Sequence, residues 1–267
     1  MSLTAAQNSP AATLEADLDL ATETLYRFLA AALSDPRGDS WSLVLNPENQ
    51  RLATVAAEVL RDEFAAPPIA LGFGELPSEQ LNLAQVVMEL ARPPHELGAE
   101  YVRVFGLATC RECPPYETEF CKNEEIFYRS QQMADVAGFY RAFGLEPGSE
   151  PRERPDHLCL ELEFMSLVLL KKRLADSADD GATVCQEACR AFMRDHLSWW
   201  APSFAVGLRR KAEQGLYAAL GQTLAALLPV DRARLGVPAP MMPLEARVVE
   251  APDECSGCLV DVVELKC

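Results

Sequence analysis

Apolar residues recur every three or four positions along most of this chain, a spacing that places them on one face of a helix. Leu158, Leu162, Met165 and Leu169 form one such stripe. Alternation with a period of two is scarce, so a sheet-based domain is not expected. The pattern predicts an all-α protein, with helices near 14–34, 47–65, 78–91, 95–105, 126–143, 156–176, 182–195, 199–213 and 215–228.

The breaks between these segments are short and often contain proline pairs, such as Pro67-Pro68. Such breaks connect helices rather than separate domains. With 267 residues, 49% of them hydrophobic, the chain can bury a sizeable core and lies near the upper limit for one domain. We therefore expect a single globular helical domain of about nine to eleven helices over 14–228. It is flanked by a flexible N-terminus (1–13) and an irregular, cysteine-containing C-terminal tail (229–267).

The segment 153–165 places acids and a histidine at the start of a predicted helix. Asp156 stands where it can cap the free N–H groups of the first turn. His157 and Glu161 share a face at four-residue spacing and can hydrogen-bond, while Glu163 projects with Asp156 from a neighbouring stripe. The N-terminus of this predicted helix is therefore suited to holding a cationic group. The alternative is a capped core helix with a solvated acidic flank.

A second motif, Cys113-Pro-Pro-Tyr-Glu-Thr-Glu119, lies ahead of the predicted helix 126–143. Two consecutive prolines cannot sit inside a helix, so they fix an extended elbow. We expect this elbow to present Tyr116, Glu117 and Glu119 at a surface. The helix that follows ends at Gly144, a residue suited to the position after a helix C-terminus.

Together these segments resemble the TorD/DmsD/NarJ family, the cytoplasmic chaperones that mature molybdenum-dependent redox enzymes. The resemblance covers roughly residues 14–228 and is most specific at the two central motifs. The N-terminal third is similar only in being helical and acidic. The matching segments, in the order in which the family has them, are Tyr101–Phe105, Pro114–Glu117, Phe139–Leu145, Pro155–Met165 and Asp195–Pro202.

The resemblance implies a non-enzymatic protein with no required cofactor. Such a protein binds the twin-arginine leader and the apo catalytic subunit of a molybdoenzyme, and holds that subunit until its cofactor is loaded. Asp156 and His157 occupy the positions that the family uses for this, and Tyr140 and Glu117 lie in motifs associated with the same groove. The leader's apolar stretch would dock against aromatic and methionine side chains. The expected leader-binding residues are Tyr116, Glu117, Phe139, Tyr140, Asp156, His157, Glu161, Glu163 and Met165.

The charge of the chain fits a basic peptide partner. It has 40 acidic and 24 basic residues, a formal net charge of −16, which argues against nucleic acid or an anionic membrane surface as partner. An acidic surface that serves only solubility would also explain this total, though not the gathering of acids at the two motifs. We find neither a signal peptide nor an apolar run of the roughly 20 residues that a membrane span needs, so we expect a cytoplasmic protein.

The cysteines are not explained by the resemblance. Cys110 and Cys113 form one C-x-x-C pair, and Cys255 and Cys258 form another. If the pairs met, four thiolates could hold a structural zinc. The alternative is free or redox-active thiols. Three further cysteines lie within helical patterns and are expected to be small core residues, namely Cys159, Cys185 and Cys189.

Three classes of protein remain open: a leader-binding chaperone, a cysteine-based metal or thiol-redox accessory protein, and a helical scaffold without a specific ligand. A hydrolytic enzyme is disfavoured because no recognisable catalytic motif is present. His196 has no clear acid–base partner in sequence and receives no role, and Trp199 and Trp200 are interpreted as packing residues. The oligomeric state, a monomer or a domain-exchanged homodimer, and the client reductase stay undetermined.

Overall fold

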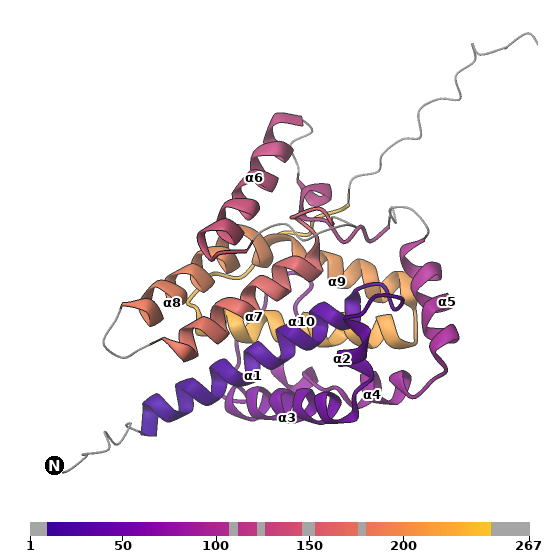
Figure 1. Cartoon of the computed structure of the whole chain (residues 1–267), viewed down its shortest axis with the longest axis horizontal. Coiled ribbons are helices and arrows are strands. Elements are labelled where there is room, and N and C mark those ends of the chain that lie inside the picture. Colours follow the sequence, from indigo (N-terminus) through magenta and orange to yellow (C-terminus); the bar gives the residue numbers. More distant parts are fainter. Residues whose placement is uncertain (1–9, 107–111, 122–125, 146–152, 176–179, 247–267) are drawn as a thin grey trace, which may run out of the picture.

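A computed structural model describes residues 10–106, 112–121, 126–145, 153–175 and 180–246 (Figure 1). The described residues form helices and no named strand, which confirms the all-α prediction. The α-helices are α1 (Pro10–Leu33), α2 (Trp41–Leu45), α3 (Pro47–Glu63), α4 (Ala84–Leu90), α5 (Pro94–Phe105), α6 (Ile126–Ala142), α7 (Leu158–Leu174), α8 (Gly181–Phe192), α9 (Ser198–Ala212) and α10 (Leu216–Arg234). Shorter turns are η1 (Ser78–Gln80), η2 (Glu117–Phe120) and η3 (Met193–Leu197).

The core lies where the long helices pack against one another. Helix α1 packs along α7 and α3, and α9 packs against α10 (Figure 1). Almost every side chain of α10 is buried, because the helix runs through the middle of the body with neighbours on several sides. This explains why its sequence is apolar all round rather than on one stripe.

Helix α6 stands apart from this body (Figure 1). Its C-terminal half packs through Val136 and Phe139, and the Phe139 ring lies 5.3 Å from that of Phe192. Its N-terminal half leaves Phe127 73% and Tyr128 50% exposed. Helix α6 is thus anchored at one end and presents aromatic side chains to solvent at the other.

Some predicted helices differ from those of the structure. The segment expected as one helix over 78–91 divides into η1 and α4, because the Asn82 side chain accepts the Ala84 N–H and starts a new helix. The segments expected at 182–195 and 199–213 join through the π-helical turn η3. Helix α2 did not appear in the predicted pattern.

A further difference concerns the last predicted helix, expected near 215–228. Helix α10 continues through Pro229 to Arg234. A proline leaves the carbonyl four residues earlier without its helical donor. Here that carbonyl, of Ala225, accepts the Leu76 N–H at 2.9 Å instead, so a neighbouring segment supplies the missing hydrogen bond.

The chain after α10 is held against the body at several points. The buried ion pair between Arg232 and Glu75 joins the end of α10 to the loop before η1, and Arg232 also donates to the Val237 carbonyl. The Phe73 N–H donates to the Pro240 carbonyl at 2.9 Å, and the Leu244 N–H donates to Ser203 Oγ at 3.1 Å. The segment 237–244 therefore follows a fixed path over the surface.

Gly72 makes this path possible. A Cβ at this position would lie 2.4 Å from Pro240 Cδ. We expect Gly72→Ala to lower the free energy of unfolding by about 1–3 kcal/mol, because the added methyl group overpacks the contact. Urea denaturation followed by circular dichroism measures the change. Gly98→Ala is the control, since a Cβ there meets nothing within 4 Å and α5 should gain about 0.5–1 kcal/mol. Equal stability of Gly72→Ala and the unmodified protein would contradict the close approach.

Candidate functional site

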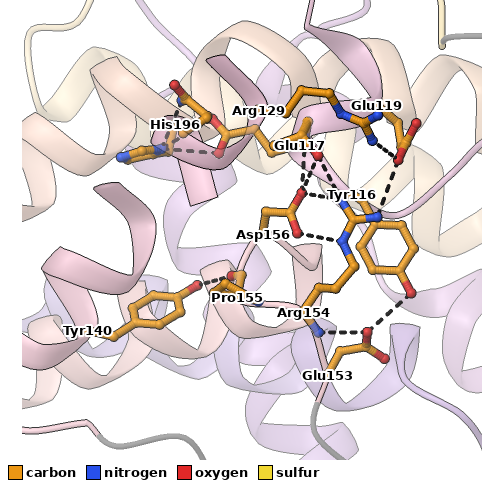
Figure 2. A network of polar contacts seen from close by, with 12 residues as sticks. Tyr116, Glu117, Glu119, Arg129, Tyr140, Glu153, Arg154, Pro155, Asp156 and His196 are labelled. Carbon is orange, nitrogen blue, oxygen red and sulfur yellow. Dashed lines mark hydrogen bonds and ion pairs between the residues drawn. The ribbon is translucent and has the colours of Figure 1, made fainter. Parts of the chain in front are cut away.

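The proline elbow and the start of α7 are paired through their backbones. The Glu117 N–H donates to the Asp156 carbonyl, and the Leu158 N–H donates to the Pro115 carbonyl, both at 2.9 Å. Tyr116 and His157 thereby form an isolated antiparallel bridge. Two motifs that are distant in sequence are thus locked into one unit (Figure 2).

The cap of α7 is His157, not Asp156 as the sequence suggested. His157 Nδ1 accepts the Cys159 N–H at 3.1 Å, satisfying one of the free donors of the first turn. Burial lowers the pKa of His157, which favours the neutral ring that an accepting Nδ1 requires. The Nδ1 contact is with the Cys159 backbone rather than with Glu161.

Because Asp156 does not cap the helix, its carboxylate accepts hydrogen bonds from other groups. Its side chain is fully buried and accepts the Thr118 N–H at 3.2 Å and the Thr118 hydroxyl at 2.8 Å. Arg154 Nε donates to Asp156 Oδ1 at 3.0 Å, and Nη2 donates to Oδ2 at 2.8 Å. This bidentate arrangement is the strong, directional form of an ion pair.

The Arg154 guanidinium is surrounded by further groups suited to it (Figure 2). Arg154 Nη2 also donates to Thr118 Oγ1 at 2.7 Å, Nη1 lies 3.3 Å from Glu119 Oε1, and Cζ lies 4.2 Å from the centroid of the Tyr116 ring. We call the four residues that hold it, Tyr116, Thr118, Glu119 and Asp156, the arginine cradle. The Arg154 side chain is 36% exposed, whereas Asp156 beneath it is covered completely.

Glu119 connects the cradle to α6. It pairs with Arg129 of that helix as well as with Arg154. At the end of the Tyr116 side chain, the hydroxyl donates to Glu153 Oε1 at 3.1 Å. Two arginines of the chain itself thus pair with Glu119, which was expected to face solvent.

Glu117 points inward and is fully buried, which corrects the expectation that the elbow presents it at a surface. Glu117 Oε1 accepts from Gln132 Nε2 of α6 and from Trp199 Nε1 of α9, both at 2.9 Å. His196 Nδ1 of η3 lies 3.2 Å from both carboxylate oxygens. Glu119 is also largely covered, at 8% exposure. The Glu117 carboxylate therefore joins the elbow to α6, α9 and η3.

Glu161 and Met165 lie fully inside the protein. Glu161 Oε2 accepts from Trp200 Nε1 at 3.2 Å, while Oε1 has no hydrogen-bond partner among the described residues. Burial raises the pKa of Glu161 well above its ordinary value, and the nearby Glu117 carboxylate raises it further. This side chain is a part of the core rather than of an open acidic face.

The remaining predicted site residues occupy different environments. The Tyr140 hydroxyl donates to the Pro155 carbonyl at 2.9 Å, and its ring lies 5.3 Å from that of Phe164, so Tyr140 braces α6 against α7. Phe139 is half-buried beside His196, with ring centroids 5.4 Å apart. Glu163 is exposed on α7. The structure brings Tyr116, Glu117, Asp156 and His157 together, whereas leader binding by these residues stays a prediction.

An apolar pocket of about 500 Å³ lies beside this cluster. It lies between η2, the exposed half of α6, the start of α9 and the end of the anchored segment 237–244. Gln132 and Trp199, which bind Glu117, form part of its wall. The complete lining is Phe120, Cys121, Tyr128, Gln132, Trp199, Pro240, Met241, Met242 and Leu244.

Most of the predicted metal site lies outside the residues that the structure describes. Cys110, Cys255 and Cys258 lie outside the described residues, and Cys113 is buried. No group of three or more potential metal ligands occurs within the part of the chain that the structure describes. A zinc site formed by the four cysteines stays a prediction. Burial in the core is confirmed for Cys159, Cys185 and Cys189.

Three residues of this cluster were not predicted from the sequence, namely Arg154, Gln132 and His196. His196 and Glu117 are 79 residues apart, so no periodicity connects them. A usable signal was present only for Arg154, which stands two positions before Asp156 and is the one arginine or lysine in Glu153–Met165. Trp200 packs in the core as expected, but Trp199 is only partly buried and lines the pocket.

Comparison with known proteins assigns the family. A family model described as nitrate reductase delta subunit matches residues 75–206, which include the elbow, α6, α7 and the Glu117 contacts. The selenate reductase assembly chaperone protein of Thauera selenatis is 32% identical over 150 residues, 55% of this chain and 75% of that protein. The chlorate reductase assembly chaperone protein of Ideonella dechloratans is 36% identical over 104 residues, 39% of this chain and 53% of that protein.

A TorD chaperone of Escherichia coli is 26% identical over 190 residues, 69% of this chain and 86% of that protein. The all-helical body and the paired motifs therefore define a protein of the assembly-chaperone class. Within that class, the chain belongs to the TorD/DmsD/NarJ family. Among its described helices, none has the length and apolarity of a membrane span.

Proposed function

We propose that this protein is an assembly chaperone that binds the twin-arginine leader of a molybdenum-dependent reductase and holds the apo catalytic subunit during cofactor insertion. It acts in the cytoplasm, by binding and without catalysis. The named roles of its relatives in reductase assembly support the general part of this proposal. Support for the leader comes from the site.

The single observation that carries leader binding is that the arginine cradle already holds a guanidinium. Asp156 offers two oxygens to its planar fork, Thr118 accepts a further N–H, and Tyr116 provides an aromatic face. Guanidinium groups favour this combination, and an ammonium group cannot reproduce it. The cradle is therefore chemically complete for one arginine side chain.

A leader arginine reaches Asp156 by taking the place of Arg154. Asp156 is fully covered, whereas Arg154 is partly exposed and precedes α7 in a non-helical segment, from which its side chain can move outward. The exchange replaces one guanidinium with another, so its net contribution to affinity is small. Most of the affinity must come from apolar contacts, and binding remains reversible, as release of a matured client requires.

Replacing Arg154 tests this exchange. We expect Arg154→Gln to bind a twin-arginine leader at least about threefold more tightly, because the incoming arginine no longer competes with a resident one. Fluorescence anisotropy with labelled synthetic leaders of reductases from the same genome measures the dissociation constant. Arg37→Gln is the matched control, since it changes net charge equally at an exposed site, where Arg37 pairs with Asp35. A leader with both arginines changed to lysine should bind the unmodified protein about tenfold more weakly.

A second variant keeps the test decisive if Arg154→Gln is poorly folded. Arg129→Gln removes the other guanidinium that engages Glu119 and should increase affinity by a smaller factor. If the folded variants bind the leader no better than Arg37→Gln, exchange is refuted. If the unmodified protein binds none of the leaders, leader recognition itself is refuted.

A further inference from the structure

Two methionines are displayed to solvent by a segment whose backbone is fixed on both sides. Met241 is 87% and Met242 62% exposed. They lie between Pro240, whose carbonyl accepts from Phe73, and Leu244, whose N–H donates to Ser203. Exposed apolar side chains on an anchored backbone form a surface with a defined position and adaptable side chains, a combination that suits recognition of varied apolar partners.

These methionines form one wall of the apolar pocket beside Glu117. Phe120 of η2, Tyr128 of α6 and Trp199 of α9 line the same pocket, which has a volume of about 500 Å³. We call this pocket the methionine groove. Its volume lies in the range of pockets that bind ligands, and its aromatic and thioether lining suits aliphatic or aromatic side chains.

The methionine groove and the arginine cradle share their supporting elements. In η2, Glu119 belongs to the cradle and the next residue, Phe120, lines the groove. In α6, Arg129 pairs with Glu119 and the preceding residue, Tyr128, lines the groove. One short chain can therefore place a basic side chain in the cradle and nearby apolar side chains in the groove.

We propose that the methionine groove is the docking site for the apolar stretch of the same leader whose arginine enters the cradle. The inference rests on the proposed leader-binding function and names a surface for its apolar half. Glu117 supports this surface from behind, because Gln132 and Trp199 donate to it and line the groove.

Charge favours the leader as occupant of the groove over a second copy of the chain and over the chain's own residues 247–267. A second copy of the chain, with a formal net charge of −16, would be repelled from a site next to buried and partly buried acids. The chain's own residues 247–267 contain five acidic and two basic residues, a poor match to the same site. A leader that carries arginines beside an apolar stretch complements both parts.

Paired variants on α6 and elsewhere separate groove contacts from general surface effects. Tyr128→Ser alters the groove, while Phe127→Ser alters the adjacent and more exposed aromatic residue, which does not line it. The double variant Met241→Ser/Met242→Ser alters two other residues that line the groove, with Met88→Ser, a change at a 58% exposed methionine of α4, as its control. None of these changes alters net charge.

The readout is leader affinity by fluorescence anisotropy, with the natural leader and a leader whose apolar stretch is replaced by serines while its arginines remain. We expect each groove variant to lose about tenfold in affinity for the natural leader, and the two controls to lose less than about twofold. The serine leader should bind the unmodified protein about tenfold more weakly and lose little more with the groove variants, because the two changes remove the same contact.

The outcomes separate this inference from the function on which it rests. If the unmodified protein binds the leader and the groove variants bind it as their controls do, the groove inference fails and leader binding stands. If the unmodified protein binds no leader, both fail. Sedimentation of the same variants addresses a second copy as occupant: a dimer abolished by the methionine change but retained in Met88→Ser would overturn the proposal.

Discussion

Replacing Glu117 with alanine should lower the free energy of unfolding by about 3 kcal/mol. The carboxylate is fully buried and lies within hydrogen-bond distance of Gln132, Trp199 and His196. Its removal leaves the His196 ring, itself fully buried, without this acceptor, and a buried polar group without a partner costs about 1–3 kcal/mol. Loss of the joint between the elbow, α6 and α9 adds to that cost.

Urea denaturation followed by circular dichroism at pH 7 measures this effect. Glu117→Gln keeps one oxygen acceptor and should lose about 1 kcal/mol. Glu63→Ala, at an exposed position at the end of α3, should change stability by less than about 0.5 kcal/mol. If Glu117→Ala unfolds at the same urea concentration as Glu63→Ala, Glu117 is not the structural joint of the site.

Glu117→Ala should also weaken leader binding, since Gln132 and Trp199 lose the group that orients them at the wall of the methionine groove. This loss of affinity should be limited to leaders that have their apolar stretch. Binding of the leader with the serine-substituted apolar stretch should change little, because that peptide does not use the groove.

Replacing Glu161 with glutamine should remove a pH dependence from the stability of the protein. Burial raises the pKa of Glu161 well above its ordinary value, so in the folded state the carboxyl keeps its proton in a pH range where the unfolded chain has released it. The folded state then binds more protons, and stability falls as pH rises from about 4.5 up to the folded pKa. The expected slope is about 1.4 kcal/mol per pH unit within that window.

Glutamine is neutral at every pH and retains an oxygen that can accept from Trp200 Nε1. We therefore expect Glu161→Gln and the unmodified protein to be similarly stable near pH 4.5, and the variant to gain a growing advantage as pH increases. Urea midpoints at pH 5 and pH 8 measure the difference. An equal difference at both pH values would show that Glu161 is ionised in the folded protein across this range.

Most helices could be predicted from the sequence because the information is local. The stripe Leu158, Leu162, Met165 and Leu169 forms a buried face of α7, as its spacing indicated. The exceptions depended on distant groups. Pro229 stays inside α10 because Leu76 supplies a hydrogen bond to the Ala225 carbonyl, and no pattern within α10 contains that fact.

The sequence indicated that the two motifs meet, but it did not indicate that most of their acids are buried. The elbow and the start of α7 do meet, as the order of the motifs suggested. Spacing along α7 assigned Asp156 to the helix cap and His157 to Glu161, whereas Asp156 pairs with Arg154 and His157 caps the helix. Spacing along the chain allowed each of these side chains several hydrogen-bond partners. The positions of the neighbouring elements determined which partner each side chain has.

The sequence by itself determined an all-α chain, the elbow that two prolines enforce, and an acidic composition suited to a basic partner, since periodicity, proline geometry and net charge are properties of neighbouring residues or of totals. Only the tertiary structure decided which acids are buried and which basic groups neutralise them. It placed Arg154 in the cradle, joined Glu117 to His196 from 79 residues away, and brought Met241, Met242 and Tyr128 to one pocket. Burial and ion pairing depend on distances between elements, which the pattern along the chain does not contain.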